Sequence, residues 1–192
     1  MEQPDDLYYL AKINNGSQAA FAFLVDKYKD MVYSIAIKIL RDTDEAQDIA
    51  QDSFIKAYQQ IGAFQGRSKF STWLYTITYR TAITRLKQNK VEIVTLGDDI
   101  DAIADHLPGQ IDLLQSKQVK HYVKMAIDKL PQIDALLVTL YYINDLPIKE
   151  IEEITGLSKP NIKIKLFRAR KVLESDLKFL MDNEQGANNE SK

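Results

Sequence analysis

The chain has 192 residues, of which 45% are hydrophobic, 27% charged and 9% aromatic, with no cysteine and only two histidines. This composition is typical of a helical globular protein, and it excludes fibrous and wholly disordered chains, disulfide frameworks and cysteine-based chemistry. The N-terminal segment MEQPDDLYYL is acidic, and no stretch approaches the roughly 20 apolar residues of a membrane span, so we expect a cytoplasmic protein without membrane insertion.

The formal net charge of -2 conceals blocks of opposite charge. Segments 66–90 and 158–173 contain lysines and arginines and no carboxylate, whereas segment 91–115 contains acidic residues and no cation. The acidic segment also holds a Pro108-Gly109 breaker and lacks helical periodicity, which predicts a linker over 91–116. A basic segment can be a solvated helix face or a surface that binds nucleic acid. The ordered patterns of residues in the two basic segments favour nucleic-acid binding.

Helical periodicity predicts three helices in the first half of the chain. Apolar residues recur at helical spacing over 19–40, and Asp42 or Thr43 caps the helix that follows. A turn-prone loop over 62–71 then leads into a helix over 71–88. These elements predict an N-terminal helical domain.

The second of these helices has one apolar and one polar face. The polar face carries Asp48, Gln51, Asp52, Ile55, Lys56 and Gln59. The isoleucine among polar residues favours a docking surface for a partner protein, and a solvated face is the equal alternative. Asp48 and Asp52 are four residues apart, but no histidine or further carboxylate pattern accompanies them, so we predict no metal site.

Cations and aromatic residues occur together on and before the third helix. One stripe at helical spacing contains Lys69, Thr76, Arg80 and Lys87, and the aromatic residues on or near it are Phe64, Phe70, Trp73, Tyr75 and Tyr79. This combination is typical of single-stranded nucleic-acid binding, although Trp73, Leu74 and Ile77 are better explained as core residues. The loop from Phe64 to Ser68 is the better place for an extruded base, because its glycine permits close backbone approach.

Further helical segments follow the acidic linker. A helix over 117–129 stops at Leu130-Pro131, where proline ends one helix and can begin the next. The segment 133–143 is short and apolar. The tail over 182–192 has nothing to bury, so we expect it to be disordered.

The last two predicted helices form a helix-turn-helix. The first is a compact amphipathic helix over 146–155 that Gly156 closes. Ser158 caps the second helix, which runs to about Leu180. Two helices joined by a short glycine turn have the geometry of this DNA-binding motif.

The outward face of that last helix mixes cations with apolar side chains. If Ile162 is the centre of the buried side, Leu166, Ala169 and Leu173 lie beside it. The opposite face then carries Lys163, Ile164, Phe167, Arg168 and Lys171, with Pro160 and Asn161 at its start. Cations bind phosphates and guanine edges while apolar groups contact thymine methyls, which favours major-groove recognition over a second protein-binding face.

Several segments together carry a family resemblance. They are DIAQDSFIKAY at 48–58, FQGRSKFSTWL at 64–74, Leu130-Pro131, Glu150-Ile151, Gly156-Leu157-Ser158 and IKIKLFRAR at 162–170. They resemble the extracytoplasmic-function (ECF) sigma factors, the smallest members of the bacterial sigma-70 family, in both predicted domains and in the same order. The resemblance implies an all-α fold of two small helical domains, an N-terminal helical bundle and a C-terminal helix-turn-helix domain, joined by an acidic linker.

The resemblance also implies a domain organisation and a function. Sigma region 2 would occupy residues 1–90, the linker 91–116, sigma region 4 residues 117–181 and a disordered tail 182–192. A protein of this family is a transcription initiation factor and not an enzyme, and it needs no cofactor. It binds core RNA polymerase, recognises the minus-35 and minus-10 promoter elements and assists promoter opening. Most ECF relatives are held inactive by an anti-sigma factor, so a partner of this kind, of unknown identity, is expected.

The family's functional residues fall on named positions of this chain. The core polymerase contacts would be Asp48, Gln51, Asp52, Ile55 and Lys56. Double-stranded promoter DNA at the minus-35 element would be bound by Lys159, Asn161, Lys163, Ile164, Phe167, Arg168 and Lys171. The single-stranded non-template minus-10 DNA would be bound by Phe64, Gly66, Arg67, Ser68, Lys69, Thr76, Tyr79, Arg80 and Lys87.

Two other functions compete with this hypothesis. A stand-alone helix-turn-helix regulator would normally dimerise and bind a palindrome without polymerase. A helical nucleic-acid enzyme would use Asp48 and Asp52 with magnesium, which is the weakest of the three explanations.

Overall fold

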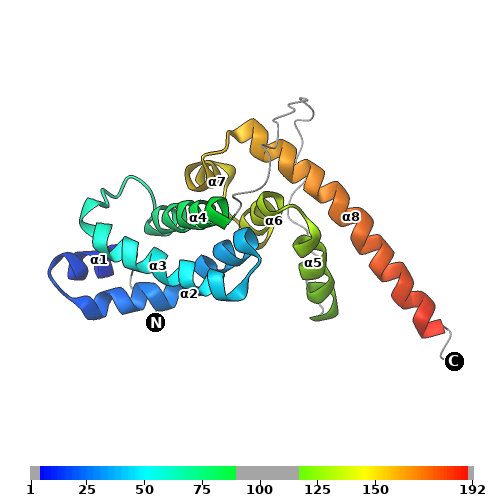
Figure 1. Ribbon diagram of the computed structural model, residues 1–192, viewed down its shortest axis with the longest axis horizontal. Coiled ribbons are helices and arrows are strands. Elements are labelled where there is room, and N and C mark those ends of the chain that lie inside the picture. Colours follow the sequence, from blue (N-terminus) through cyan, green and yellow to red (C-terminus); the bar gives the residue numbers. More distant parts are fainter. Residues whose placement is uncertain (1–4, 90–116, 190–192) are drawn as a thin grey trace. The chain divides into compact units, whose positions relative to one another are not determined.

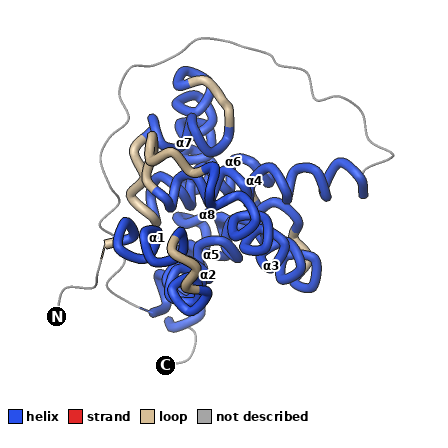
Figure 2. Tube along the Cα trace, turned by 90° about the vertical axis from the view of Figure 1, so that its left-hand side faces the viewer, coloured by secondary structure: helices blue, strands red, loops and turns tan. Residues whose placement is uncertain are grey.

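The structure is a computed structural model that describes residues 5–89 and 117–189. These residues form two compact units, and the regular elements within them are all helices (Figure 1; Figure 2). The predicted all-α class with two helical domains is therefore confirmed. The predicted acidic linker over 91–116 lies outside the described residues.

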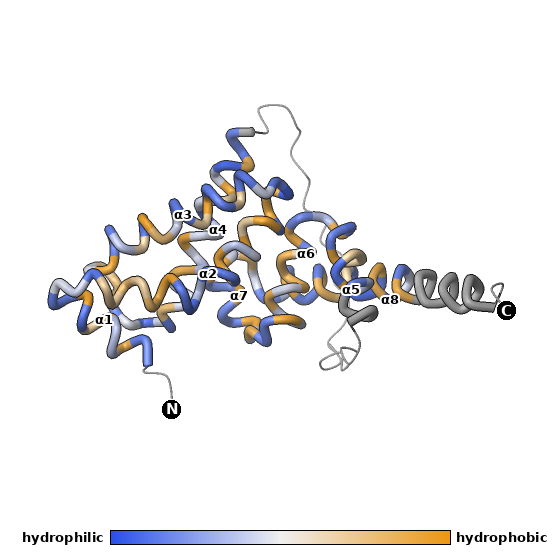
Figure 3. The backbone as a smooth tube through the Cα atoms, turned by 90° about the horizontal axis from the view of Figure 1, so that it is seen from below, coloured by the Kyte–Doolittle hydropathy of each residue, from blue (hydrophilic) through white to orange (hydrophobic). Residues whose placement is uncertain are grey.

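The first unit is a bundle of helices around α2. Its elements are α1 (Asp6–Asn14), α2 (Gln18–Leu40), α3 (Thr43–Gln60), the short 3₁₀ turn η1 (Ile61–Ala63) and α4 (Phe70–Asn89). Helix α2 packs against α1, α3 and α4, and α3 packs against α4. Hydrophobic and hydrophilic residues alternate along these helices (Figure 3). Their buried apolar side chains include Leu24, Val32, Ile35, Ile39, Ala46, Ile49, Ala57, Phe70 and Leu74.

The junction between α2 and α3 is fixed by two adjacent residues. Arg41 ends α2 in the left-handed conformation (φ 59°). The Asp42 carboxylate then accepts hydrogen bonds from the backbone N–H groups of Asp44 (3.0 Å) and Glu45 (2.9 Å). Of the two N-cap residues that the sequence allowed, the structure therefore selects Asp42, which satisfies two amides at the start of α3.

Helix α1 is an element that the sequence analysis does not predict. It buries only Leu10 and Ile13 against the bundle. It is also attached through Asp6, whose carboxylate accepts hydrogen bonds from Lys27 Nζ (2.7 Å) and Tyr28 Oη (2.5 Å) on α2. Because these contacts join residues that are far apart in sequence, the local pattern does not reveal the helix.

The second unit contains the helix-turn-helix. Its elements are α5 (Lys117–Lys129), α6 (Gln132–Val138), the π-helical turn η2 (Thr139–Ile143), α7 (Ile148–Thr155) and α8 (Lys159–Asn189). Helix α8 packs against α5 and α6. The core of this unit includes Ala126, Ile127, Leu130, Leu136, Leu137, Leu140, Ile151, Ile162, Leu166 and Ala169.

Two boundaries in this unit differ from the sequence-based prediction. The apolar segment 133–143 is an α-helix that changes to a π turn, in which Asn144 N–H donates to Thr139 O at 3.0 Å. Helix α8 continues past Leu180 to Asn189, so 182–189 is helical instead of disordered, and 190–192 lies outside the described residues. A helix that has already formed adds one hydrogen bond for each further residue, and no proline interrupts this stretch.

Candidate functional site

Helix α8 has the inner, buried side that the helical wheel predicts. Ile162, Leu166 and Ala169 are buried, as predicted for the inner face. On the outer side Asn161, Lys163, Ile164 and Phe167 are half-buried, and Lys159, Arg168 and Lys171 are exposed. Lys171 Nζ lies 4.6 Å from the centroid of the Phe167 ring, a cation–π contact that places charge and apolar surface together.

A glycine and a carboxylate position the start of α8. Gly156 ends α7 in the left-handed conformation (φ 74°), and its N–H donates to Glu152 O at 2.8 Å. The Glu152 carboxylate accepts a hydrogen bond from Lys159 N–H at 2.6 Å. It thus satisfies one of the free amides at the N-terminus of α8 and joins the two helices of the motif.

Sequence reasoning did not assign a role to two residues beside this turn. Tyr141 and Lys149 line a groove of about 800 Å³. The other lining residues are Pro147, Ile148, Glu152, Lys159 and Lys163. Three lysines therefore surround the groove, and only a three-dimensional arrangement could have added Lys149 to the cations of α8.

The polar face of α3 is largely open to solvent. Asp48, Gln51, Ile55 and Lys56 are exposed and Asp52 is half-buried, so the five residues predicted to dock a protein lie on one side of the helix. Ile55 is 46% exposed, whereas Ala46, Ile49 and Ala57 on the opposite side are buried. An exposed isoleucine among polar side chains is the apolar centre expected of a protein-docking face.

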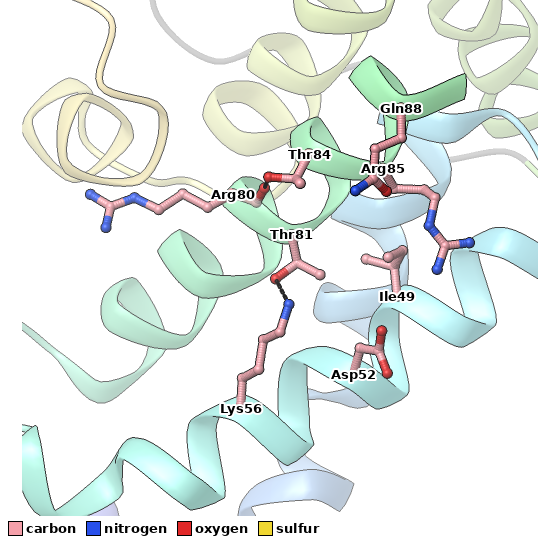
Figure 4. A pocket seen from close by; sticks show the side chains of 8 residues that line it. All are labelled: Ile49, Asp52, Lys56, Arg80, Thr81, Thr84, Arg85 and Gln88. Carbon is pink, nitrogen blue, oxygen red and sulfur yellow. Dashed lines mark hydrogen bonds between the residues drawn. The ribbon is translucent and has the colours of Figure 1, made fainter. Parts of the chain in front are cut away.

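The side chain of Lys56 reaches from α3 to α4. Its Nζ donates a hydrogen bond to Thr81 Oγ1 on α4 at 3.2 Å (Figure 4). The amine therefore points toward a cleft between α3 and α4, which also has Asp52, Arg80 and Arg85 in its lining.

The loop between η1 and α4 is anchored by aromatic rings. Phe64 is half-buried, and its ring centroid lies 5.3 Å from that of Trp73 and 5.8 Å from that of Phe70. Gly66 adopts a left-handed conformation (φ 67°) that other residues adopt at a cost. The loop side chains of Arg67 and Lys69 are exposed and Ser68 is half-buried.

The residues of the predicted stripe lie on α4, except Lys69, which directly precedes it. Lys69, Arg80 and Lys87 are exposed, and Thr76 and Tyr79 are half-buried, with burial raising the pKa of the Tyr79 phenol. Thr76 Oγ1 donates to Thr72 O at 2.8 Å. Of the residues predicted as core, Leu74 is fully buried, whereas Trp73 and Ile77 are half-buried.

Metal ligands and membrane spans are absent from the part of the chain that the structure describes. Within residues 5–89 and 117–189, no three histidine or acidic side chains gather in a way that could hold a metal ion. None of the described helices has the length and apolar character needed to cross a membrane.

Comparisons with known proteins agree with this arrangement. Residues 24–91 match the family model of sigma-70 region 2, and residues 120–173 match that of sigma-70 region 4. The chain is 33% identical over 182 residues to the ECF RNA polymerase sigma factor SigW of Bacillus subtilis, a match that covers 89% of this chain and 96% of that protein. It is 29% identical over 189 residues to the RNA polymerase sigma-H factor of Pseudomonas aeruginosa, covering 94% and 98%.

Two solved structures share the fold. CnrH in complex with the cytosolic domain of CnrY has a TM-score of 0.60 and 19% identity, covering 93% of this chain and 97% of that one. The sigma factor RpoE of Bartonella quintana, in complex with the anti-sigma factor NepR, has a TM-score of 0.60 and 23% identity, covering 82% and 96%. With both family regions present in order and a relative that matches along nearly its whole length, the chain belongs to the ECF RNA polymerase sigma factors of the sigma-70 family.

Proposed function

We propose that this sigma factor binds core RNA polymerase through α3, reads the minus-35 element with α8, and engages the minus-10 element with the 64–69 loop and α4. The observation that carries the proposal is the outward face of α8, where Arg168 and Lys171 are exposed beside Ile164 and Phe167 after a glycine turn. A solvent-facing helix gains nothing from this mixture, whereas a helix in the major groove uses both kinds of side chain.

The polymerase contact is assigned to Asp48, Gln51, Asp52, Ile55 and Lys56. The exposed Ile55 supports this assignment, because an apolar side chain with a polar rim is the usual anatomy of a protein interface. The carboxylates around it would select a partner surface that carries positive charge.

The minus-10 surface is assigned to Phe64, Gly66, Arg67, Ser68, Lys69, Thr76, Tyr79, Arg80 and Lys87. The exposed Arg67 and Lys69 suit the phosphates of an unpaired strand, and the conformation of Gly66 lets the backbone approach a base. Phe64 packs against Trp73 and Phe70, so its first role is to hold the loop in place.

The minus-35 surface is assigned to Lys159, Asn161, Lys163, Ile164, Phe167, Arg168 and Lys171. Helix α8 would lie in the major groove with Arg168 at base edges and Lys171 near the backbone. The protein would act in the cytoplasm as an initiation factor without catalytic chemistry or a cofactor of its own. The solved relatives were captured with an anti-sigma factor or with a partner's cytosolic domain, which supports a regulatory partner that covers the surfaces of this chain.

Runoff transcription tests the proposal as a whole. Purified bacterial core polymerase is supplied with fragments of the source genome, with and without this protein. New discrete transcripts that depend on the protein are expected, and their start sites identify both promoter elements. Absence of transcripts together with absence of core binding would favour a stand-alone regulator, which gel filtration would reveal as a dimer.

A matched pair of variants tests the α3 assignment. Asp52→Ala should weaken the capture of core polymerase before any DNA is present, because Asp52 lies on the proposed docking face. Asp30→Ala removes the same charge from an exposed position on α2 and should leave capture unchanged. Equal capture by both variants would contradict the assignment.

A further inference from the structure

Two cations of α8 lie at the edges of its buried side. Helical geometry places Lys165 about 60° to one side of the buried Ile162 and Arg170 about 80° to the other. Both side chains are half-buried, whereas Lys171 on the outward face is exposed. Lys165 and Arg170 therefore belong to the basic segment of α8 without belonging to its outward face.

Lys165 connects one edge of α8 to α6. Its Nζ lies 3.4 Å from Oδ1 of Asp134, and the side chain of Asp134 is only 17% exposed. A carboxylate with so little access to water depends on a nearby cation to offset its desolvation. The charge of Lys165 is thus used within the second unit.

Arg170 connects the other edge of α8 to the π turn η2. Its Nε donates to Glu174 Oε1 at 2.6 Å, which restrains the guanidinium from one side. Arg170 Nη1 and Tyr142 Oη are both buried, and neither atom has a hydrogen-bond partner within the part of the chain that the structure describes. The two groups are neighbours, because burial raises the pKa of the Tyr142 phenol and the charge of Arg170 opposes that rise.

This arrangement is not explained by stability alone. Two buried polar atoms without a hydrogen bond cost free energy, and an apolar pair of the same shape would avoid that cost. The guanidinium is nevertheless held against η2, and only a quarter of its side chain is exposed. A buried polar contact that does not increase stability can still fix one geometry among several.

The π turn extends the contact of Arg170 to the rest of the helix-turn-helix. Tyr142 packs edge-to-face on Tyr141 at 4.9 Å, centroid to centroid, and Tyr141 lines the groove at the start of α8. After the turn, Leu146 N–H donates to Leu140 O at 3.0 Å, and α7 begins two residues later. A cation that holds α8 against η2 therefore also fixes α8 relative to α7.

We infer that Lys165 and Arg170 are positioning residues, which fix the rotation of α8 about its own axis and do not contact DNA. The inference rests on the proposed minus-35 function and deepens it. A small rotation of α8 would move Arg168 away from the base edges, while the outward cations would still reach phosphates. Loss of either positioning residue should therefore lower selectivity for the minus-35 sequence and leave general affinity for DNA in place.

Holoenzyme binding to promoter duplexes tests the inference. A promoter found by runoff transcription is prepared with its native minus-35 element and with a scrambled one, and both are titrated at several salt concentrations. The positioning variants are Arg170→Gln, Arg170→Lys and Lys165→Gln. Lys171→Gln removes a cation of the proposed DNA surface, and Lys124→Gln is a charge-matched control from an exposed position on α5. Urea unfolding shows which variants are folded at the temperature of the titration.

Each positioning variant is expected to lower the ratio of native to scrambled affinity by about tenfold, the effect of losing about one base contact, at an unchanged slope of log K against log salt. Lys171→Gln should instead lower the slope by about 0.9 and keep the ratio, and Lys124→Gln should change neither. A lower slope in Arg170→Gln or Lys165→Gln would identify a phosphate contact and overturn the inference.

Arg170→Lys is the decisive variant, and it remains informative if Arg170→Gln does not fold. Lysine preserves the charge, but it cannot hold Glu174 and approach Tyr142 at the same time. A wild-type ratio in Arg170→Lys would show that charge alone is needed and would overturn the inference. Equal affinity of the wild-type holoenzyme for the native and scrambled elements would instead contradict the proposed function itself.

The ionisation of Tyr142 provides a second measurement, which a general loss of stability would not reproduce. The difference in phenolate absorbance with and without Tyr142→Phe isolates this phenol, whose charged or titratable neighbours are Arg170, Tyr141 and Glu174. Because a nearby cation favours the phenolate, Arg170→Gln should move the titration of Tyr142 to higher pH. An unmoved titration would show that the two groups do not meet and would overturn the inference.

Discussion

Arg168 has the position expected of a base-reading residue, because it is exposed on the outward face of α8 while Leu166 and Ala169 beside it are buried. We expect Arg168→Ala to cost about 1–3 kcal/mol of promoter affinity in the holoenzyme and to relax selectivity at one position of the minus-35 element. Binding to promoters with single substitutions measures both effects. Lys124→Ala, at an exposed position on α5, is the control. Equal affinity of the Arg168→Ala and wild-type holoenzymes would refute this role.

The phenol of Tyr28 should make the free energy of unfolding depend on pH. Burial raises the pKa of this phenol far above its ordinary value of 10.0, and the hydrogen bond to Asp6 adds to the shift. Because the pKa is higher in the folded state, the stabilising contribution is complete below pH 10 and is lost as the pH rises above it.

The comparison of wild type with Tyr28→Phe measures this contribution. At neutral pH the variant should lose about 1 kcal/mol of the free energy of unfolding, since Asp6 loses a neutral donor. Above about pH 10 the difference should shrink, because only the wild type then has to keep this phenol protonated. Denaturant unfolding across this range provides the values. A difference that does not change with pH would contradict the argument.

Among the elements, the turn between α7 and α8 depends on Glu152. Glu152→Ala removes the acceptor of Lys159 N–H and should lower the free energy of unfolding by about 1 kcal/mol, the usual effect of losing a helix cap. Glu152→Gln keeps an oxygen that can accept this bond and should be closer to wild type. Urea unfolding of the full chain distinguishes the two variants. Equal stability of the alanine and glutamine variants would show that the bond contributes nothing.

The sequence pattern predicts some of the helices and misses others. Amphipathic patterns are sufficient for α2, α3 and α7, because one face of each helix is buried and the apolar spacing records it. The same reasoning identifies the outer face of α8 around Arg168. Helix α1 is missed because bonds from Asp6 to residues on another helix hold it. The direction of Lys56 is likewise set by the packing of α3 against α4, which no local pattern encodes.

For the whole molecule, the main consequence of the proposed site assignments is that each unit would carry its own DNA-binding surface. Because each proposed surface is small, we expect either one alone to bind weakly, and both to act together only when polymerase holds them at a fixed distance. Insertion of about 5 bp between the minus-35 and minus-10 elements, half a helical turn, should therefore abolish most of the holoenzyme's affinity. The weak binding of the free chain should not change. Strong, spacing-dependent binding by the free chain would contradict the expectation that the two surfaces act together only in the holoenzyme.

The aromatic cluster beneath the 64–69 loop provides a built-in spectroscopic reporter. Trp73 is the single tryptophan of the chain, and it lies 5.3 Å from Phe64 of the loop, centroid to centroid. In the free chain its fluorescence can be excited selectively, so the emission then comes from the first unit alone and is sensitive to the environment of the loop. Capture of an unpaired base there should quench or shift that emission. Binding of a single-stranded minus-10 oligonucleotide to the free chain can thus be followed on unlabelled protein, in real time and from the loop that is proposed to hold the strand.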